Sequence, residues 1–269
     1  SLRYMTISHE PSYWVGDRGT WQFMVNTSID SSAAGTFGLG SLTSDFSHEK
    51  ETAHAHYYSV EFDKEKGASK GSRLELTPTS HGAAVRFTFD KGVANRNVLL
   101  DCVRGTGGIN FDNSGNVTTF TGYSDHTSNG SKRMHVYGTF NKKAKVTKTS
   151  GKAGLAGFHE DVVEMKIATS YISEEQAKKN LSLEIESGED FDDVYNKAQR
   201  VWDEKLNIIS DVKGAAYEQL VSLYSNIYRL FAYPNSMSEN TGTNDNPVWK
   251  YKSPYRDTSA EPVEGEIYI

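Results

Sequence analysis

The chain has 269 residues, enough to bury a substantial core as one large domain or as one and a half. Its 29 Lys and Arg against 35 Asp and Glu residues give a net charge of -6, without the basic surplus that nucleic acid or an anionic membrane selects. There is no apolar run of about 18 residues, so we expect no membrane insertion, and a neutral or polar ligand fits better.

Residues 1–172 consist of short alternating segments between turn residues, the pattern of a β-sandwich. Segments 57–62, 73–77 and 85–89 alternate with period two, as strands with one buried face do. Residues 113–116 carry the types that tolerate a tight reversal, which predicts a hairpin. Residues 142–152 are rich in Lys, Thr and Gly and predict a solvated loop or sheet edge.

The periodicity changes at Ser173. Residues 173–176 have the form of a capping box, which predicts that a helix begins there. Segments 191–209 and 214–233 carry apolar residues at three- and four-residue intervals, so each predicts an amphipathic helix, the second stopped by Pro234. The polar residues from 235 to 246 predict a long loop.

The densest group of ligand-binding residue types lies in segment 8–19. Trp14 offers an indole face for stacking on a sugar ring, and Asp17 offers a carboxylate for neighbouring hydroxyls, with His9 and Gly16 beside them. A packed surface loop, with Trp14 as its anchor and Asp17 bonding turn amides, explains the same residues. No nucleophile elbow surrounds Ser8, so a Ser-His-Asp triad is disfavoured.

Other reactive residue types give weaker signals. His48, His54 and His56 have a spacing that a metal site uses, but without a nearby cysteine they read more simply as structural histidines. The single cysteine, Cys102, ends an apolar segment and is expected to be a small buried side chain rather than a nucleophile. A glycosidase needs two carboxylates, and spacing alone selects no pair from the acidic residues Asp45, Glu51, Asp125, Glu160 and Asp161.

Five segments together resemble glycoside hydrolase family 92, a family of exo-acting α-mannosidases. Segment 7–19 (ISHEPSYWVGDRG) is similar to the family's S/T-H-Q-P-S-P-W-x-G-D-Y-G loop. In chain order follow four more similar segments: 46–60 (FSHEKETAHAHYYSV), 74–79 (LELTPT), 170–181 (SYISEEQAKKNL) and 224–230 (YSNIYRL). The departures include Glu10 for Gln, Tyr13 for the second Pro, and His81 where the family pattern ends in Arg.

The resemblance implies a mainly β fold: a galactose-mutarotase-like β-sandwich, linker helices and the start of an (α/α)6 helical domain. We expect residues 1–172 to form the sandwich, 173–233 the linker helices, and 234–269 the truncated start of the catalytic domain. Both ends of the sequence lie in mid-pattern, so we expect a fragment that lacks most of the catalytic domain.

The function implied by the resemblance is removal of terminal α-linked mannose, α-1,2 by preference, through calcium-dependent inverting hydrolysis. The substrate-binding residues of this chain would be His9, Trp14, Gly16 and Asp17. The catalytic and calcium-binding residues would lie outside it, and the fragment alone would be inactive. The partner is a mannose-containing glycan, and the location secreted, periplasmic or at the cell surface. The alternatives are a non-catalytic carbohydrate-binding β-sandwich and a surface module without a ligand.

Overall fold

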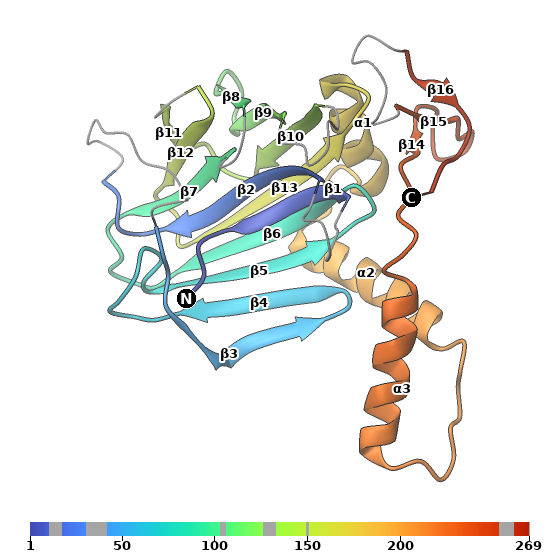
Figure 1. The fold of residues 1–269 in the computed structure, drawn as a ribbon. Coiled ribbons are helices and arrows are strands. Elements are labelled where there is room, and N and C mark those ends of the chain that lie inside the picture. The colour runs from blue at the N-terminus through green and yellow to red at the C-terminus, as the bar shows by residue number, and fades with distance from the viewer. Residues whose placement is uncertain are drawn as a thin grey trace.

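The protein is described by a computed structural model that covers residues 1–10, 18–30, 42–102, 106–125, 133–148, 151–252 and 261–268. Two antiparallel sheets form a sandwich, with three helices to one side (Figure 1). The five-stranded sheet has the order β1 (Met5–Glu10), β2 (Arg18–Asn26), β7 (Arg96–Asp101), β12 (Ala153–Phe158), β11 (Lys145–Lys148). The eight-stranded sheet has the order β3 (Phe46–His54), β4 (Tyr57–Phe62), β5 (Ser72–Pro78), β6 (Gly82–Phe89), β13 (Val162–Ser170), β10 (Met134–Phe140), β9 (Thr119–Ser124), β8 (Gly107–Asp112).

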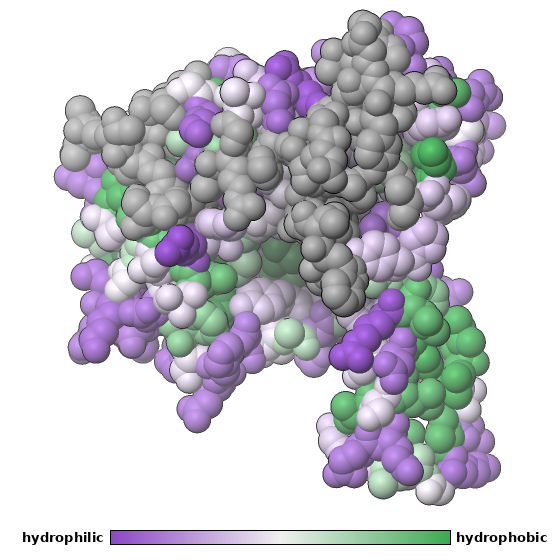
Figure 2. All heavy atoms as spheres, viewed as in Figure 1, coloured by the Kyte–Doolittle hydropathy of each residue, from purple (hydrophilic) through white to green (hydrophobic). Residues whose placement is uncertain are grey.

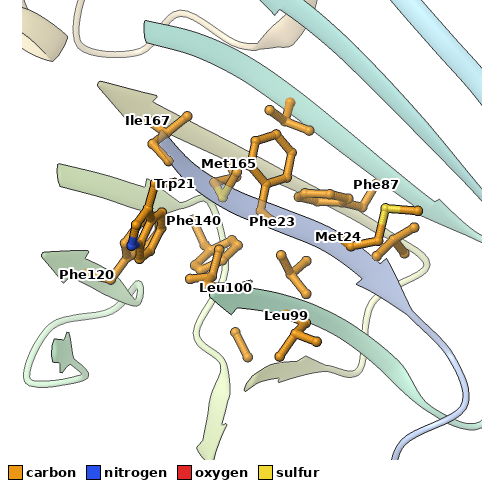
Figure 3. Packing of buried hydrophobic residues seen from close by; sticks show 14 of the residues in the cluster. Trp21, Phe23, Met24, Phe87, Leu99, Leu100, Phe120, Phe140, Met165 and Ile167 are labelled. Carbon is orange, nitrogen blue, oxygen red and sulfur yellow. The ribbon is translucent and has the colours of Figure 1, made fainter. Parts of the chain in front are cut away.

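The core lies between these sheets and is rich in aromatic rings (Figure 3). Trp21 of β2 is fully buried and stacks on Phe120 of β9, with ring centroids 5.7 Å apart and planes 18° apart. Phe23 meets Phe87 edge-on at 6.3 Å, so β2 contacts the opposite sheet along its length. Gly138 is required beside this cluster, because a Cβ there would lie 2.1 Å from the Phe120 ring.

The predicted hairpin and sheet edge are both confirmed. Strands β8 and β9 pair antiparallel around residues 113–118, with Phe111 opposite Phe120. Strand β11 carries lysines at an outer position of the five-stranded sheet, within the segment predicted as a solvated edge. At the edge of the other sheet, β3 is charged and shifts register between Phe46 and Glu51, a device that discourages pairing with another chain.

The helices are α1 (Glu174–Glu184), α2 (Phe191–Leu206) and α3 (Tyr217–Leu230). Helix α1 begins at the predicted residue, since the Ser173 hydroxyl accepts a hydrogen bond from the Gln176 backbone N–H at 3.1 Å. The Gln176 side chain does not complete the capping box; it donates instead to Asn180 Oδ1 at 2.8 Å and to the Asn240 carbonyl at 2.9 Å. Leu181 packs against Ala84 and Ala168, whose strand neighbours face the core, so α1 covers the outer face of the eight-stranded sheet.

The long loop predicted over residues 235–246 is interrupted by a two-residue strand at Glu239–Asn240, and no strand was predicted beyond it. A small antiparallel sheet forms there from β14 (Glu239–Asn240), β15 (Trp249–Tyr251) and β16 (Val263–Glu264). Asn240 shapes its first turn, because its Oδ1 accepts from the backbone N–H groups of Gly242 at 2.8 Å and Val248 at 3.0 Å. Strands this short carry no readable periodicity, which is why a polar sequence concealed them.

The predicted fold class is confirmed: a mainly β chain whose two antiparallel sheets form a sandwich and precede the helices. All strands of both large sheets end by Ser170, and the first helix follows at Glu174. None of the described helices is both long enough and apolar enough to cross a membrane.

Candidate functional site

The predicted sugar-binding segment joins the first two strands. Strands β1 and β2 pair antiparallel up to Glu10 opposite Arg18, so the connection between them spans residues 11–17. Trp14, Gly16 and Asp17 belong to this connection and lie outside the described residues. His9 belongs to β1, but its side chain is also outside them, so the four predicted substrate-binding residues remain a prediction.

The base of this hairpin is anchored by the core. Ile7 pairs with Trp21 across the two strands, and Trp21 is fully buried against Phe120. On its other side β2 pairs with β7, with Gln22 opposite Asp101. The two strands that flank residues 11–17 are therefore anchored in the core of the sandwich.

A buried polar junction joins the sandwich to the helices and to the C-terminal sheet; we define it as His81, Thr169, Tyr171, Asn180, Glu184 and Glu239. Glu239 is fully buried, and its carboxylate accepts from the Tyr171 backbone N–H and from the Asn180 side chain, both at 2.8 Å. Asn180 also donates to the Thr169 carbonyl at 2.9 Å. One helix residue thus connects the end of β13 with the beginning of β14.

His81 completes the junction from the position just before β6. Its Nδ1 lies 2.5 Å from Glu184 Oε1, its backbone N–H donates to Glu184 Oε2 at 2.9 Å, and its Nε2 lies 3.2 Å from the Ser238 carbonyl. Both ring nitrogens therefore face oxygen acceptors, the pattern that suits a doubly protonated ring.

The electrostatics of the junction favour the protonated forms. Burial alone would lower the pKa of His81, but the hydrogen bond and charge of Glu184 outweigh burial and raise this pKa above its ordinary value. Burial raises the pKa of Glu239, against the hydrogen bonds from Ser170, Asn180 and the Tyr171 backbone and against the charge of His81. Because both pKa values are raised, the folded protein holds these protons more tightly than the unfolded chain. The junction therefore stabilises the fold less as the pH rises.

We expect His81→Arg to reduce the pH dependence of stability. A raised folded-state pKa for His81 means that its contribution is complete below the unfolded-state value of 6.5 and is lost as the pH rises through the folded-state pKa. Arginine stays charged, so the variant should be more stable than the wild type at high pH by about 1.5–3 kcal/mol, the range for a hydrogen bond to a charged group. Urea unfolding from pH 5.5 to 9 measures this, with the exposed His159→Arg as control. Parallel curves for the wild type and His81→Arg would contradict the assignment.

A second polar group fixes the start of α2. The Arg86 guanidinium donates to Glu75 from Nε at 2.9 Å and Nη2 at 3.2 Å, and to Asp192 from Nη1 at 2.9 Å. Its Cζ lies 4.4 Å from the centroid of the Phe191 ring. Burial would raise the pKa of Glu75, but hydrogen bonds from Arg86 and Tyr57 lower it below its ordinary value. This group is a docking contact for the helix.

The histidines considered for a metal have other partners. His48 Nδ1 lies 2.6 Å from Glu51 Oε2 at the exposed sheet edge. The rings of His54 and His56 stack with centroids 5.7 Å apart, and His56 also meets Tyr195 edge-on. Within the described ranges, no three His, Cys, Asp or Glu side chains form a group that fits a metal ion.

Three of the acidic residues considered for catalysis have side-chain partners of their own. Asp125 accepts from Arg133 Nε at 2.7 Å and Nη2 at 2.9 Å, Asp161 lies 2.8 Å from Arg96, and Glu51 accepts from the Tyr58 hydroxyl at 2.6 Å. Cys102 is buried, and burial raises the pKa of its thiol, which suits a packing role. The sequence analysis singled out these residues but did not predict the junction. The one junction residue that it did single out was His81, as a departure from the Arg of the family pattern.

Several solved structures have a similar fold. A family GH92 inverting mannosidase from Bacteroides thetaiotaomicron is similar with a TM-score of 0.81 and 24% identity, covering 99% of this chain and 36% of that chain. A family GH92 α-mannosidase from the same organism is similar with a TM-score of 0.62 and 20% identity, covering 81% of this chain and 32% of that chain. At identities below 25%, these similarities establish the fold alone, which is a β-sandwich followed by helices.

The family itself follows from the sequence matches. The N-terminal domain model of glycosyl hydrolase family 92 matches residues 1–185, and the catalytic domain model matches residues 176–269. This chain belongs to glycosyl hydrolase family 92, as the resemblance predicted. An uncharacterized secreted glycosidase from Arthroderma benhamiae is 36% identical over 98 residues, which is 36% of this chain and 12% of that protein. The chain thus spans about a third of the first solved relative and about an eighth of the curated one.

Proposed function

We propose that this chain supplies the sandwich domain and a substrate-pocket loop of an exo-acting α-mannosidase, which removes terminal α-linked mannose, α-1,2 by preference, with inversion. The observation that carries the proposal is the family match, which continues from the N-terminal domain into the catalytic domain. Among similar structures are an inverting mannosidase and an α-mannosidase in complex with mannoimidazole. A purely carbohydrate-binding sandwich would not account for the catalytic-domain match.

Within this enzyme, His9, Trp14, Gly16 and Asp17 are the proposed substrate-binding residues of the sandwich. The indole of Trp14 would cover the apolar face of the mannose ring, and Asp17 would accept hydrogen bonds from two neighbouring hydroxyls. Support comes from the strands that flank residues 11–17. Strand β1, which contains His9, pairs with β2, and β2 is anchored in the core by Trp21.

The proposed division of labour follows the chain. Residues 1–172 form the sandwich, 173–233 the linker helices, and 234–269 the start of the catalytic domain. Inverting hydrolysis uses one carboxylic acid to protonate the leaving oxygen and a carboxylate to activate water. Three of the acidic side chains considered for this task, Glu51, Asp125 and Asp161, are engaged with partners of their own, which supports placing the catalytic pair outside this chain.

Calcium is proposed as the metal of the complete enzyme. Calcium needs six to eight oxygen ligands, and the described residues offer no cluster of three acidic or histidine side chains to hold it. The described residues therefore offer no carboxylate cluster that fits the ion, and we propose that residues of the remaining catalytic domain bind it. The name of the secreted relative supports a secreted, periplasmic or cell-surface location, where glycans are available.

Mannose release by the complete enzyme tests the proposal. We expect it to release mannose from an α-1,2-linked mannobioside, to lose this activity in a calcium chelator and to regain it when calcium is restored. The first-formed mannose should be the β-anomer by NMR, because the proposed reaction inverts the configuration. Matched controls are the β-linked mannobioside and the 269-residue chain alone, and neither should yield mannose. Activity that persists in chelator would contradict the calcium proposal, and no release from any α-mannoside would contradict the function.

A further inference from the structure

The C-terminal sheet is attached to the rest of the protein largely through polar contacts. In Figure 2 the apolar surface gathers where Figure 1 places α3, whereas the visible residues of the C-terminal sheet are mostly hydrophilic. Of the described residues beyond Pro234, Met237 and Ile267 are the ones that pack against the core of the sandwich. Polar groups therefore largely decide how firmly β14 and its neighbours are held.

Most contacts between α1 and this sheet do not change with pH near neutrality. The Gln176 side chain donates to the Asn240 carbonyl at 2.9 Å, and the Asn244 side chain donates to a backbone carbonyl of α1 at 3.0 Å. Lys179 donates to the carbonyl of Thr241, and a lysine ammonium keeps its proton up to about pH 10. Amide groups keep their donors at every pH. This side of the attachment is therefore permanent.

The ring of His81 differs, because it serves two elements at once. Nδ1 lies 2.5 Å from Glu184 Oε1 on α1, and Nε2 lies 3.2 Å from the carbonyl of Ser238, the residue before β14. A doubly protonated ring donates to both oxygens, whereas a neutral ring has one N–H. The remaining proton favours the carboxylate, which is the stronger acceptor, so the contact with Ser238 is the one that is lost. The His81 side chain is 11% exposed, which leaves little room for water to replace the donor.

The charged groups around the ring act in the same direction. Glu184 faces it from α1 and Glu239 from β14. Strand β13 contributes the neutral Thr169, whose backbone N–H and hydroxyl donate to the His81 carbonyl at 2.9 and 3.1 Å. Glu239 is fully buried, and the positive ring offsets part of the cost of burying its carboxylate. A neutral ring therefore weakens the hold on Glu239 as well as on Ser238, and both residues lie at the start of the C-terminal sheet.

We propose that His81 is a proton-operated latch of the complete enzyme: its doubly protonated ring holds α1 and the C-terminal sheet on the sandwich together, and its deprotonation releases the C-terminal sheet. The proposal rests on the proposed function for one step, that the sandwich loop and the catalytic domain share a substrate pocket. Release displaces the two sides of this pocket from each other, so His81 is a positioning residue. Although burial lowers the pKa of His81, Glu184 raises it by more, so release occurs above the ordinary value of 6.5.

Hydrogen exchange of the complete enzyme tests the latch without an activity measurement. The Tyr171 backbone N–H donates to Glu239, so its exchange reports whether β14 is held. In the wild type its protection factor, corrected for the intrinsic pH dependence of exchange, should fall at least about tenfold between about pH 6 and pH 9. It should stay constant in His81→Arg, which keeps its charge, and should be low at every pH in His81→Gln, which is neutral. Amides of β7, in the middle of the five-stranded sheet, are the control and should not change.

The pH profile of mannose release is the second readout. In the wild type, kcat/KM should fall on the alkaline side with the same midpoint as the protection of Tyr171. His81→Arg should move this midpoint up by at least about one pH unit and leave the acidic limb, which reports the catalytic base, in place. The exposed His159→Arg is the matched control and should change neither limb.

Three results would overturn the latch: protection of Tyr171 that does not depend on pH in the wild type, an alkaline limb that is the same in His81→Arg, or wild-type protection and activity in His81→Gln at pH 6. Protection that falls with pH as expected, without mannose release from any α-mannoside, would count against the proposed function alone.

Discussion

Trp21→Ala is expected to lower the free energy of unfolding of this chain by about 3–5 kcal/mol, the cost of removing a large aromatic side chain from a packed core. Trp21 is fully buried, stacks on Phe120 and lies against Gly122, so the surrounding strands cannot close over the space. Urea unfolding followed by circular dichroism measures the change.

Tyr217→Ala is the control for this prediction. Tyr217 is 76% exposed on α3, and its removal should change the free energy of unfolding by less than about 0.5 kcal/mol. Trp21→Phe should fall between the two, because a smaller ring still stacks on Phe120. A loss below about 1 kcal/mol for Trp21→Ala would show that the core relaxes around the cavity and would contradict the anchoring of the β1–β2 hairpin in the core.

Trp14→Ala in the complete enzyme is expected to lower kcat/KM for an α-mannoside roughly 10- to 100-fold, or about 1.4–2.8 kcal/mol of transition-state stabilisation. The reason is the loss of the aromatic face that is proposed to cover the sugar ring. The melting temperature should not change, since the proposal gives this residue a role in binding the sugar. Steady-state kinetics and thermal unfolding on the same preparation measure both effects.

Trp14→Phe separates stacking from packing. Phenylalanine retains an aromatic face, so this variant should keep most of the activity that the alanine variant loses. Equal losses for both variants would indicate that the indole N–H matters rather than the ring face. Unchanged kinetics in Trp14→Ala would remove the residue from the substrate pocket.

Much of the fold was predictable because its elements repeat a local pattern. Alternation over Tyr57–Phe62 correctly predicted a strand, and the three- and four-residue spacing from Phe191 onward correctly predicted a helix. The predicted buried face of that helix is buried only at Phe191 and Val194, whereas Val201 is 50% exposed. The N-cap at Ser173 was equally local, since it depends on residues three positions apart.

The junction was not predictable in this way. His81 meets Glu184 across 103 positions of sequence, and Asn180 meets Glu239 across 59. Glu239 lies in a polar stretch that reads as solvated, yet it is fully buried because the Tyr171 backbone and Asn180 supply its hydrogen bonds. Contacts of this kind depend on the tertiary fold, and periodicity carries no information about them.

The completion of both large sheets by Ser170 has a consequence for synthesis. Domains generally fold in the order in which they leave the ribosome, so the sandwich is able to form while the helices are still being translated. Its core is not sealed at that stage, because Met237 and Ile267 also pack against it. We therefore expect the nascent sandwich to remain open at one side, and vulnerable to proteases there, until residues beyond 267 have emerged.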